Sequence, residues 1–326
     1  MESPLKMIQS VLVVGATGFL GSNLVSYFNR QKIHVRIFRR STSETEKLKD
    51  LRFEDFIGDM TSKEDLRSAI DGCEVIFYLA ACTSLSRRKL EERWRTNVEG
   101  FSTFLSNLVA LNFKGRLIYC SSVGAIGCSK KPQLLSEEDQ LCISEFDYFQ
   151  TKRKAEEMVL EAAKQGLDAV IVNPATLFGL NGKHIFMNKI FFSKNYFRLL
   201  CYPVGGTSLT FVEDVCQGML SAACFGKKGE RYILAGHNLT FYEIFKRIAQ
   251  NFKVIKPMIP LFSFFLIGMA HFFEKISWHS FGVETAKLAS RFSYYSSQKA
   301  MNELNYTITS VTEGFKKMNE AFGVLR

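Results

Sequence analysis

The sequence lacks an apolar stretch long enough to cross a membrane. Met258–Phe273 is almost wholly apolar, but it contains Pro260, Gly268 and His271 and falls short of the roughly 18 to 20 apolar residues that a span needs. We therefore expect no transmembrane span and interpret the segment as a buried or interfacial helix, with peripheral membrane contact as the alternative. The residues up to Gln9 also lack the apolar core of a secretory signal, which predicts a cytoplasmic protein.

Cysteine pairs and histidine clusters at metal-ligand spacing are also missing. The eight cysteines are scattered without a CxxC pair, so we expect buried, reduced thiols in a reducing compartment and no metal site. His184, His237, His271 and His279 have no partner at ligand or triad spacing. We interpret them as structural or surface residues.

Charge of one sign is not concentrated in any long run. The net charge is +10, but lysine and arginine are spread along the chain, with short clusters only, such as Arg36/Arg39/Arg40 and Arg87–Lys89. This distribution does not favour nucleic acid as a partner and points to an anionic small ligand. With 326 residues, 47% of them hydrophobic, the chain can form one large core and a smaller lobe.

Short apolar runs alternate with amphipathic stretches through the first half of the chain. The runs predict buried strands at Val11–Val14, Val35–Phe38, Val75–Leu79, Leu117–Cys120 and Ala169–Val172. The stretches between them have helical periodicity at Phe19–Asn29, Lys63–Ile70, Leu90–Leu111 and Phe146–Lys164. This alternation predicts an α/β fold with a doubly wound parallel sheet of the Rossmann type.

The pattern becomes irregular after Pro174, where we expect a strand at Arg231–Leu234 and a helix at Glu213–Cys224. We predict a Rossmann domain that binds NADP(H) over residues 1–174, with the chain crossing back around 205–225, and a smaller α/β substrate lobe in 175–326. Ligands of such sheets bind outside the carboxyl ends of the strands.

A glycine-rich turn follows the first predicted strand. It reads Gly15-Ala16-Thr17-Gly18-Phe19-Leu20-Gly21. Glycines at these positions let the backbone approach a pyrophosphate, which then lies at the positive end of the following helix. A plain strand-to-helix turn is the alternative, but the position after a first strand favours nucleotide binding.

The second predicted strand ends in Arg39 and Arg40, where an NAD-specific protein usually has an acidic residue. Guanidinium groups can hydrogen-bond a 2′-phosphate, so NADP(H) is favoured, with NAD as the alternative. A solvated basic turn is the other interpretation. Further cofactor contacts are expected from residues that follow the third strand or end the fourth, namely Asp59, Met60, Leu79, Ala80 and Ala81.

Tyr148 and Lys152 are four residues apart and so share one helix face. A nearby ammonium favours the phenolate, so we expect the Tyr148 pKa to be lowered and the residue to exchange protons near neutral pH. Ser122, just past the fifth strand, can hold a substrate oxygen beside the Tyr148 hydroxyl. A tyrosine and lysine pair on a helix is more often a pair of surface residues without a catalytic role. Only the order of the motifs along this sequence favours catalysis.

With Asn97 and Asn173-Pro174 this ordered set resembles the extended short-chain dehydrogenases/reductases, and within them the dihydroflavonol-4-reductase-like and 3β-hydroxysteroid dehydrogenase-like branch. The resemblance covers nearly the whole chain. It also includes Thr96–Gly100, Val172–Gly179, Thr210–Val215, Gly229–Leu234 and Ser296–Ala300.

The resemblance implies hydride transfer between a nicotinamide and a carbonyl or alcohol carbon. Tyr148 would exchange the proton, Lys152 would bind the nicotinamide ribose, and Ser122 would orient the substrate. Asn97 would support a water or backbone relay. The resemblance also places Asn173 and Pro174 near the nicotinamide, and Arg40 at the position of the 2′-phosphate arginine.

Three interpretations of function remain open. Val123-Gly124 follow Ser122 where sugar dehydratases have an Asp-Glu pair, so dehydration is rejected. The first interpretation is an NADP(H)-dependent reductase of a ketone or aldehyde, or the reverse oxidation of the alcohol. The alternatives are a nucleotide-sugar epimerase with bound NAD and a non-catalytic dinucleotide-sensing protein.

The aromatic and basic segment Lys183–Leu200 predicts a cleft for a moderately large, partly apolar small-molecule substrate. Its alternative is an amphipathic helix packed on the core. For the oligomeric state, monomer and homodimer both remain, with Leu90–Leu111 and Phe146–Lys164 as the expected contact of a dimer.

Overall fold

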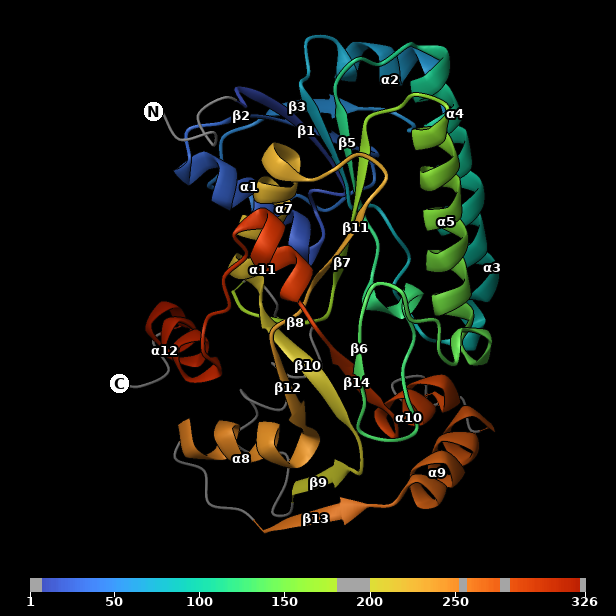
Figure 1. Ribbon diagram of the computed structural model, residues 1–326, viewed down its shortest axis with the longest axis vertical. Coiled ribbons are helices and arrows are strands. Elements are labelled where there is room, and N and C mark those ends of the chain that lie inside the picture. Colours follow the sequence, from blue (N-terminus) through green and yellow to red (C-terminus); the bar gives the residue numbers. More distant parts are fainter. Residues whose placement is uncertain (1–7, 181–199, 252–256, 276–281, 323–326) are drawn as a thin grey trace.

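A wholly parallel sheet of seven strands forms the centre of the protein (Figure 1). The computed structural model describes residues 8–180, 200–251, 257–275 and 282–322. The strands of this sheet are β1 (Ser10–Val14), β2 (His34–Arg39), β3 (Glu54–Ile57), β4 (Val75–Tyr78), β5 (Arg116–Cys120), β7 (Ala169–Pro174) and β11 (Arg231–Leu234). Their order is β11-β7-β5-β4-β1-β2-β3. This confirms the predicted doubly wound α/β fold.

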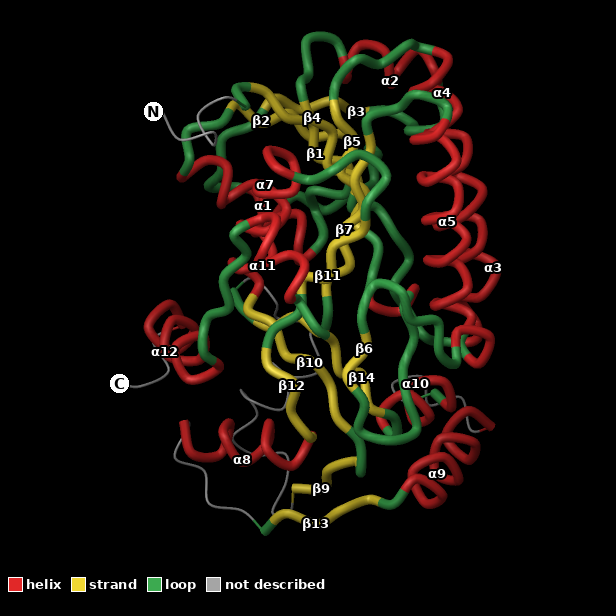
Figure 2. The backbone as a smooth tube through the Cα atoms, in the orientation of Figure 1, coloured by secondary structure: helices red, strands yellow, loops and turns green. Residues whose placement is uncertain are grey.

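Helices cover both faces of the sheet, as the tube in Figure 2 shows. One face carries α1 (Phe19–Arg30), α7 (Val212–Phe225) and α11 (Gln298–Leu304), and the other α2 (Lys63–Ile70), α4 (Phe101–Ala110) and α5 (Asp147–Lys164). Along β1, Val11 and Val13 pack on the first face and Leu12 and Val14 on the second. Both faces are therefore buried, which explains why the strands have continuous apolar sequences.

The helix predicted over Leu90–Leu111 is interrupted. The structure has α3 (Leu90–Trp94), a π-helical turn at Arg95–Gly100 and then α4. Turns of this kind insert an extra residue into a helix and often occur at functional sites. The apolar periodicity of Leu90–Leu111 predicted a helix but did not indicate the π-helical turn within it.

The smaller lobe lies at the carboxyl edge of the large sheet. Its strands are β6 (Leu134–Leu135), β8 (Thr176–Phe178), β9 (Leu200–Pro203), β10 (Gly206–Phe211), β12 (His237–Thr240), β13 (Met258–Leu261) and β14 (Phe292–Tyr295). Its helices are α8 (Phe241–Asn251), α9 (Ser263–Lys275), α10 (Val283–Ala289) and α12 (Val311–Phe322). Strands β12-β10-β14-β6 form a second sheet, with β8 pairing to β10, and β9 pairs with β13.

The apolar segment Met258–Phe273 forms strand β13 and most of helix α9, so the buried or interfacial helix expected there covers only part of the segment. Leu266 and Ala270 pack inward against α10, but Phe264 is 67% exposed and Phe272 is 60% exposed. Both faces of α9 have apolar side chains, so the sequence periodicity does not distinguish the buried face from the exposed one. Across the described residues, no helix is long and apolar enough to cross a membrane. Peripheral membrane contact stays a prediction.

The thiols are less uniformly buried than expected. Cys73, Cys120, Cys128 and Cys216 are buried, but Cys201 is exposed and the other three are partly exposed. His237 contributes a ring nitrogen 3.1 Å from the Thr309 carbonyl oxygen, as a structural residue would. His184 and His279, like most of the predicted cleft segment, lie outside the described residues.

Candidate active site

The glycine-rich turn joins β1 to α1 at the carboxyl edge of the sheet. Gly15 has φ +93°, and a Cβ at this position would lie 2.7 Å from the Ala80 nitrogen. A Cβ on Gly21 would lie 2.2 Å from the Gly15 carbonyl oxygen. No side chain caps the start of α1 at Gly18. The first turn of α1 thus presents backbone N–H groups to an anion without a competing side chain.

A cleft of about 860 Å³ opens over this turn. Ten of the predicted cofactor residues line it, namely Gly15, Thr17, Gly18, Arg39, Arg40, Asp59, Met60, Leu79, Ala80 and Ala81. Phe19, Leu20 and Gly21 lie in α1, directly behind the turn. The cleft has the size of a small-molecule site, and its glycine cradle fits a dinucleotide pyrophosphate.

The two arginines at the end of β2 differ in what they contact. Arg39 binds Asp55 of β3 with two nitrogens, Nε at 2.9 Å from Oδ1 and Nη2 at 2.6 Å from Oδ2. Arg40 is exposed, and its positive charge contributes to lowering the pKa of Asp59. Asp55 therefore already occupies the fork of Arg39, which leaves Arg40 as the better placed cation for a phosphate in the cleft.

Asp59 lies at the end of the third strand with one oxygen engaged. Its Oδ1 accepts hydrogen bonds from Thr61 N at 2.9 Å and from Thr61 Oγ1 at 2.8 Å. These bonds to Thr61, followed by the charge of Arg40, lower the Asp59 pKa. The carboxylate is therefore ionised at neutral pH and keeps acceptor capacity on Oδ2.

Ser122 and Tyr148 come together at the carboxyl end of β5. Ser122 follows β5, and its Oγ accepts a hydrogen bond from Gly124 N at 3.1 Å. Tyr148 is the second residue of α5, and the Ser122 side chain lies near enough to its phenol to affect the Tyr148 pKa. The structure thus joins two of the predicted catalytic residues across an interval of the chain that contains β6.

The pKa of Tyr148 is raised to about 12, mainly by desolvation of the partly buried phenol, and the Ser122 side chain and the charge of Arg93 only partly oppose this. The expected lowering of this pKa by Lys152 is therefore wrong for the protein without ligands. In the partly buried phenol, desolvation of the phenolate outweighs the favourable charges.

The raised pKa predicts that Tyr148 keeps its proton in the cofactor-free protein up to pH values near 12. Ultraviolet difference titration of wild type against Tyr148→Phe measures this directly. We expect identical tyrosinate absorbance in both up to about pH 10, the usual tyrosine pKa. An extra ionisation in wild type below about pH 9 would contradict the burial argument.

Lys152 lies one turn after Tyr148 on α5 and is 3% exposed. Its Nζ donates a hydrogen bond to the Cys120 carbonyl oxygen at 3.0 Å and lies 5.2 Å from the centre of the Tyr119 ring. Burial lowers the Lys152 pKa, whereas Cys120 and Glu156 raise it. The ammonium is thus held at the end of β5, beside Ser122.

Asn97 lies in the π-helical turn and joins two elements of the site. Its side-chain amide donates to the Cys82 carbonyl oxygen at 3.0 Å and accepts from Cys82 N at 2.7 Å. The amide nitrogen also lies 3.2 Å from Thr151 Oγ1 on α5. Asn97 therefore fixes the loop after β4 to the helix that carries Tyr148 and Lys152.

Asn173, at the end of β7, is fully buried. Its Nδ2 donates to the Ser122 carbonyl oxygen at 2.9 Å and to Glu156 Oε1 at 2.5 Å. The adjacent Pro174 pairs with Leu234 of β11. Neither residue lines the cleft over the glycine turn, so their predicted contact with a nicotinamide stays a prediction.

Three charged residues on α5 or beside it were not predicted from the sequence. Arg93 of α3 is fully buried, and its Nη1 lies 3.4 Å from Glu284 Oε2 of α10. Glu156 is buried one turn beyond Lys152. The spacing of Tyr148, Lys152 and Glu156 by four could have indicated Glu156. No local signal indicates the Arg93–Glu284 contact, since it joins two separate lobes.

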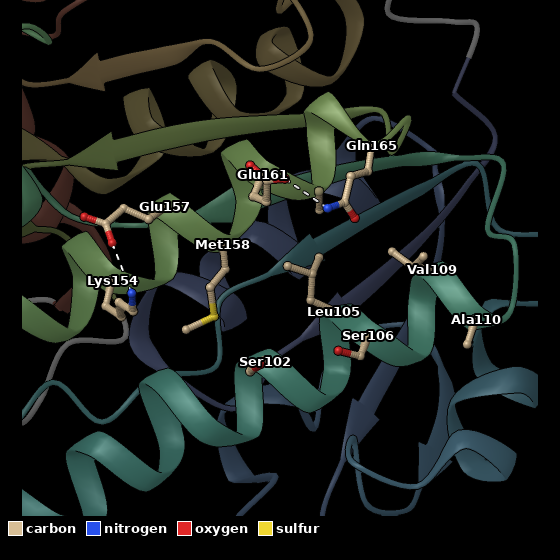
Figure 3. Close-up of a pocket in the computed structure, with 11 residues that line it drawn as sticks. Ser102, Leu105, Ser106, Val109, Ala110, Lys154, Glu157, Met158, Glu161 and Gln165 are labelled. Atoms are coloured by element: carbon tan, nitrogen blue, oxygen red, sulfur yellow. Dashed lines mark hydrogen bonds and ion pairs between the residues drawn. The ribbon is translucent and has the colours of Figure 1, made fainter.

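A second hollow of about 550 Å³ lies on the outer surface, between α4 and α5 (Figure 3). Leu105 and Met158 point into it, and the pairs Lys154–Glu157 and Glu161–Gln165 lie along α5 at its side. None of the predicted catalytic or cofactor residues lines it. It belongs to the surface on which the sequence predicts the contact of a dimer. Light scattering would distinguish a monomer from a homodimer.

Comparison with known proteins agrees with this geometry. Residues 11–235 match the NAD dependent epimerase/dehydratase family. A Synechocystis sp. protein with the provisional name dihydroflavonol 4-reductase is 30% identical over 94% of this chain and 92% of its own length. Sterol demethylase protein B of Methylococcus capsulatus is 28% identical over 94% of this chain and 96% of its own.

A solved structure shares the fold at lower identity. DesIV, a dTDP-glucose 4,6-dehydratase from Streptomyces venezuelae with NAD and TYD bound, aligns with TM-score 0.77 and 18% identity, covering 98% of each chain. The matching family and relatives, together with the glycine cradle, establish an NAD(P)-dependent oxidoreductase. The chain belongs to the NAD dependent epimerase/dehydratase family, the extended short-chain dehydrogenases/reductases, in the branch of the dihydroflavonol reductases and 3β-hydroxysteroid dehydrogenases.

Proposed function

We propose that this protein is an NADP(H)-dependent oxidoreductase that reduces a ketone or aldehyde on a moderately large, partly apolar molecule, or oxidises the corresponding alcohol. The observation that carries the proposal is the Ser122 side chain next to the Tyr148 phenol, one helical turn before the buried ammonium of Lys152. Arg40 lines the cleft over the glycine-rich turn, which supports NADP(H) as the cofactor, whereas Ser122, Tyr148 and Lys152 are not among the residues that line this cleft.

The cofactor, when bound, supplies the hydride that goes to the carbonyl carbon. Tyr148 donates its proton to the carbonyl oxygen, so that carbon and oxygen together gain one hydride and one proton. Ser122 accepts from Gly124 N, which leaves its hydroxyl hydrogen available for a substrate oxygen or for Tyr148. The Lys152 ammonium stabilises the phenolate that remains on Tyr148 after the transfer. The Lys152 side chain is buried, which limits the access of water to the ammonium.

The apolar character of the substrate is supported by two observations. The names of the relatives refer to a dihydroflavonol and to a sterol, both of them large molecules with fused or linked rings. At the start of α5, the side chains of Cys142, Ile143 and Leu288 pack, together with Tyr148, against a buried cluster of Cys128, Phe146 and Phe149. We therefore expect a panel of ring-bearing ketones to contain better substrates than small sugars or nucleotide sugars.

Arg40 is predicted to determine the preference for NADPH over NADH. Loss of one charge-assisted hydrogen bond costs about 1.5–3 kcal/mol, so Arg40→Asp should weaken NADPH binding by roughly 10- to 150-fold and leave NADH binding nearly unchanged. Titration by nicotinamide fluorescence measures both affinities. Lys228→Asp is the matched control, because this exposed lysine precedes β11 at the amino edge of the sheet.

Two outcomes would redirect the proposal. Equal affinity for NADPH and NADH, or purified protein that already carries NAD, would favour the nucleotide-sugar epimerase, and conversion of a UDP-sugar without net oxidation would then test it. Binding of NADPH without turnover of any carbonyl or alcohol would favour the non-catalytic dinucleotide-sensing protein.

A further inference from the structure

A fully buried carboxylate lies directly behind the candidate catalytic residues. Glu156 occupies α5 one turn after Lys152 and two turns after Tyr148, on the face that packs against the sheet. Its Oε1 accepts a hydrogen bond from Asn173 Nδ2 at 2.5 Å. Its Oε2 lies 3.4 Å from Arg231 Nη1 on β11. A buried carboxylate is costly unless it is paired, and here it has both an amide and a guanidinium.

This carboxylate connects to Ser122 through a single side chain. The Asn173 amide nitrogen has two hydrogens, and the second is donated to the Ser122 carbonyl oxygen at 2.9 Å. Arg231, Glu156 and Asn173 thus form a continuous chain from β11 through α5 and β7 to the backbone of Ser122. Movement of the Glu156 carboxylate would release the amide that holds this backbone.

Glu156 also acts on Lys152 through the charge of its ionised form: burial raises the Glu156 pKa, and Arg231 and Asn173 oppose that rise. The two residues are four apart on one helix and therefore neighbours on the same face. Burial lowers the Lys152 pKa, and the negative charge of Glu156 opposes this by favouring the ammonium. The ammonium is the form that donates to the Cys120 carbonyl oxygen.

We propose that Glu156 is a positioning residue of the active site, which fixes the Ser122 backbone through Asn173 and keeps Lys152 charged, with Arg231 as its counterion. The inference rests on the proposed function for the role of Ser122, whereas the action on Lys152 needs only the cofactor site. Glu156 has no exposed surface and makes no contact with substrate in this role.

The test compares Glu156→Gln and Arg231→Met with wild type. Glu156→Gln keeps the size and one acceptor but removes the charge, and Arg231→Met removes the counterion and promotes protonation of Glu156. Each should lower kcat by roughly 10- to 100-fold, since hydrogen bonds to charged groups have strengths of about 1.5–3 kcal/mol. Because the two residues act as a unit, the double variant should lose little more than either single variant. Glu161→Gln, an exposed carboxylate on the same helix, is the control and should retain wild-type turnover.

A second readout does not depend on turnover. NADPH affinity is measured by nicotinamide fluorescence as the pH is raised, because the Lys152 ammonium is expected to hold the nicotinamide ribose. Loss of the Glu156 charge lowers the Lys152 pKa further, so affinity should fall at a lower pH in Glu156→Gln than in wild type. The titratable and charged groups that surround this pair are Tyr119 and Cys120 of β5, Tyr148 and Arg153 of α5, and Arg231 of β11.

The outcomes separate the inference from the proposed function. If wild type binds NADPH but reduces no carbonyl, the proposed function fails, and the shift in the pH dependence of binding still decides the role of Glu156. If Glu156→Gln is folded by its thermal midpoint and matches Glu161→Gln in both turnover and pH dependence, the inference is overturned. If Glu156→Gln does not fold, Arg231→Met gives the decision by the same two measurements.

Discussion

Tyr148→Phe is expected to lower kcat by about 10²- to 10⁴-fold, the contribution of a positioned general acid. The variant keeps the partly buried ring, which packs beside Phe149, and loses only the hydroxyl near the Ser122 side chain. NADPH affinity should therefore change little. Steady-state kinetics on a proven carbonyl substrate, together with a fluorescence titration of the cofactor, measure both quantities.

The control for this substitution is Tyr242→Phe, which removes the same hydroxyl from an exposed tyrosine at the start of α8. It should leave turnover at the wild-type value. Undiminished turnover in Tyr148→Phe would show that Tyr148 is not the proton donor. It would then be necessary to look for another proton donor near Ser122.

Gly21→Ala is expected to have the largest effect on stability and on cofactor binding together. The new Cβ would lie 2.2 Å from the Gly15 carbonyl oxygen and 2.8 Å from the Ala16 Cα, both of them backbone atoms that cannot rotate away. Helix α1 would have to shift from β1, and the N–H groups at its start would move with it. Overpacking of this kind costs typically about 1–3 kcal/mol, and we expect the free energy of unfolding to fall by at least that amount.

The matched control is Gly268→Ala in helix α9, where a Cβ meets nothing within 4 Å. Alanine there should raise stability by up to about 1 kcal/mol, because glycine is a poor helix former. Chemical denaturation gives both values, and a titration with NADPH shows whether Gly21→Ala also loses the cofactor. Equal stability of the two variants would mean that the turn and α1 are not as closely packed as described.

The sequence predicted the central layer well because its signals are local. Residues in β4 and β7 are buried on both faces, so each strand appears as an unbroken apolar run between polar loops. The helix at Lys63–Ile70 and the strand at Arg231–Leu234 have the predicted bounds. Such patterns depend only on neighbours along the chain.

The parts of the site that were not predicted depend on contacts between distant segments. Arg39 appeared equivalent to Arg40 in the sequence, but the pairing of β2 with β3 brings Asp55 to its guanidinium. The Tyr148 pKa depends on the desolvation of the phenol in the folded protein, which cannot be inferred from the spacing of Tyr148 and Lys152. Arg93 and Glu284 are 191 residues apart in the chain.

The way in which α11 closes the first face of the sheet has a consequence for how the protein is made. Ala300, Leu304 and Tyr306 pack in the same core as β1, β2 and α7. A ribosome must therefore synthesise nearly the whole chain before this core can be completed, and the earlier part emerges with an apolar face still uncovered. Folding of the nucleotide-binding layer should finish only after α11 has left the ribosome, and nascent chains that end before α11 should bind chaperones.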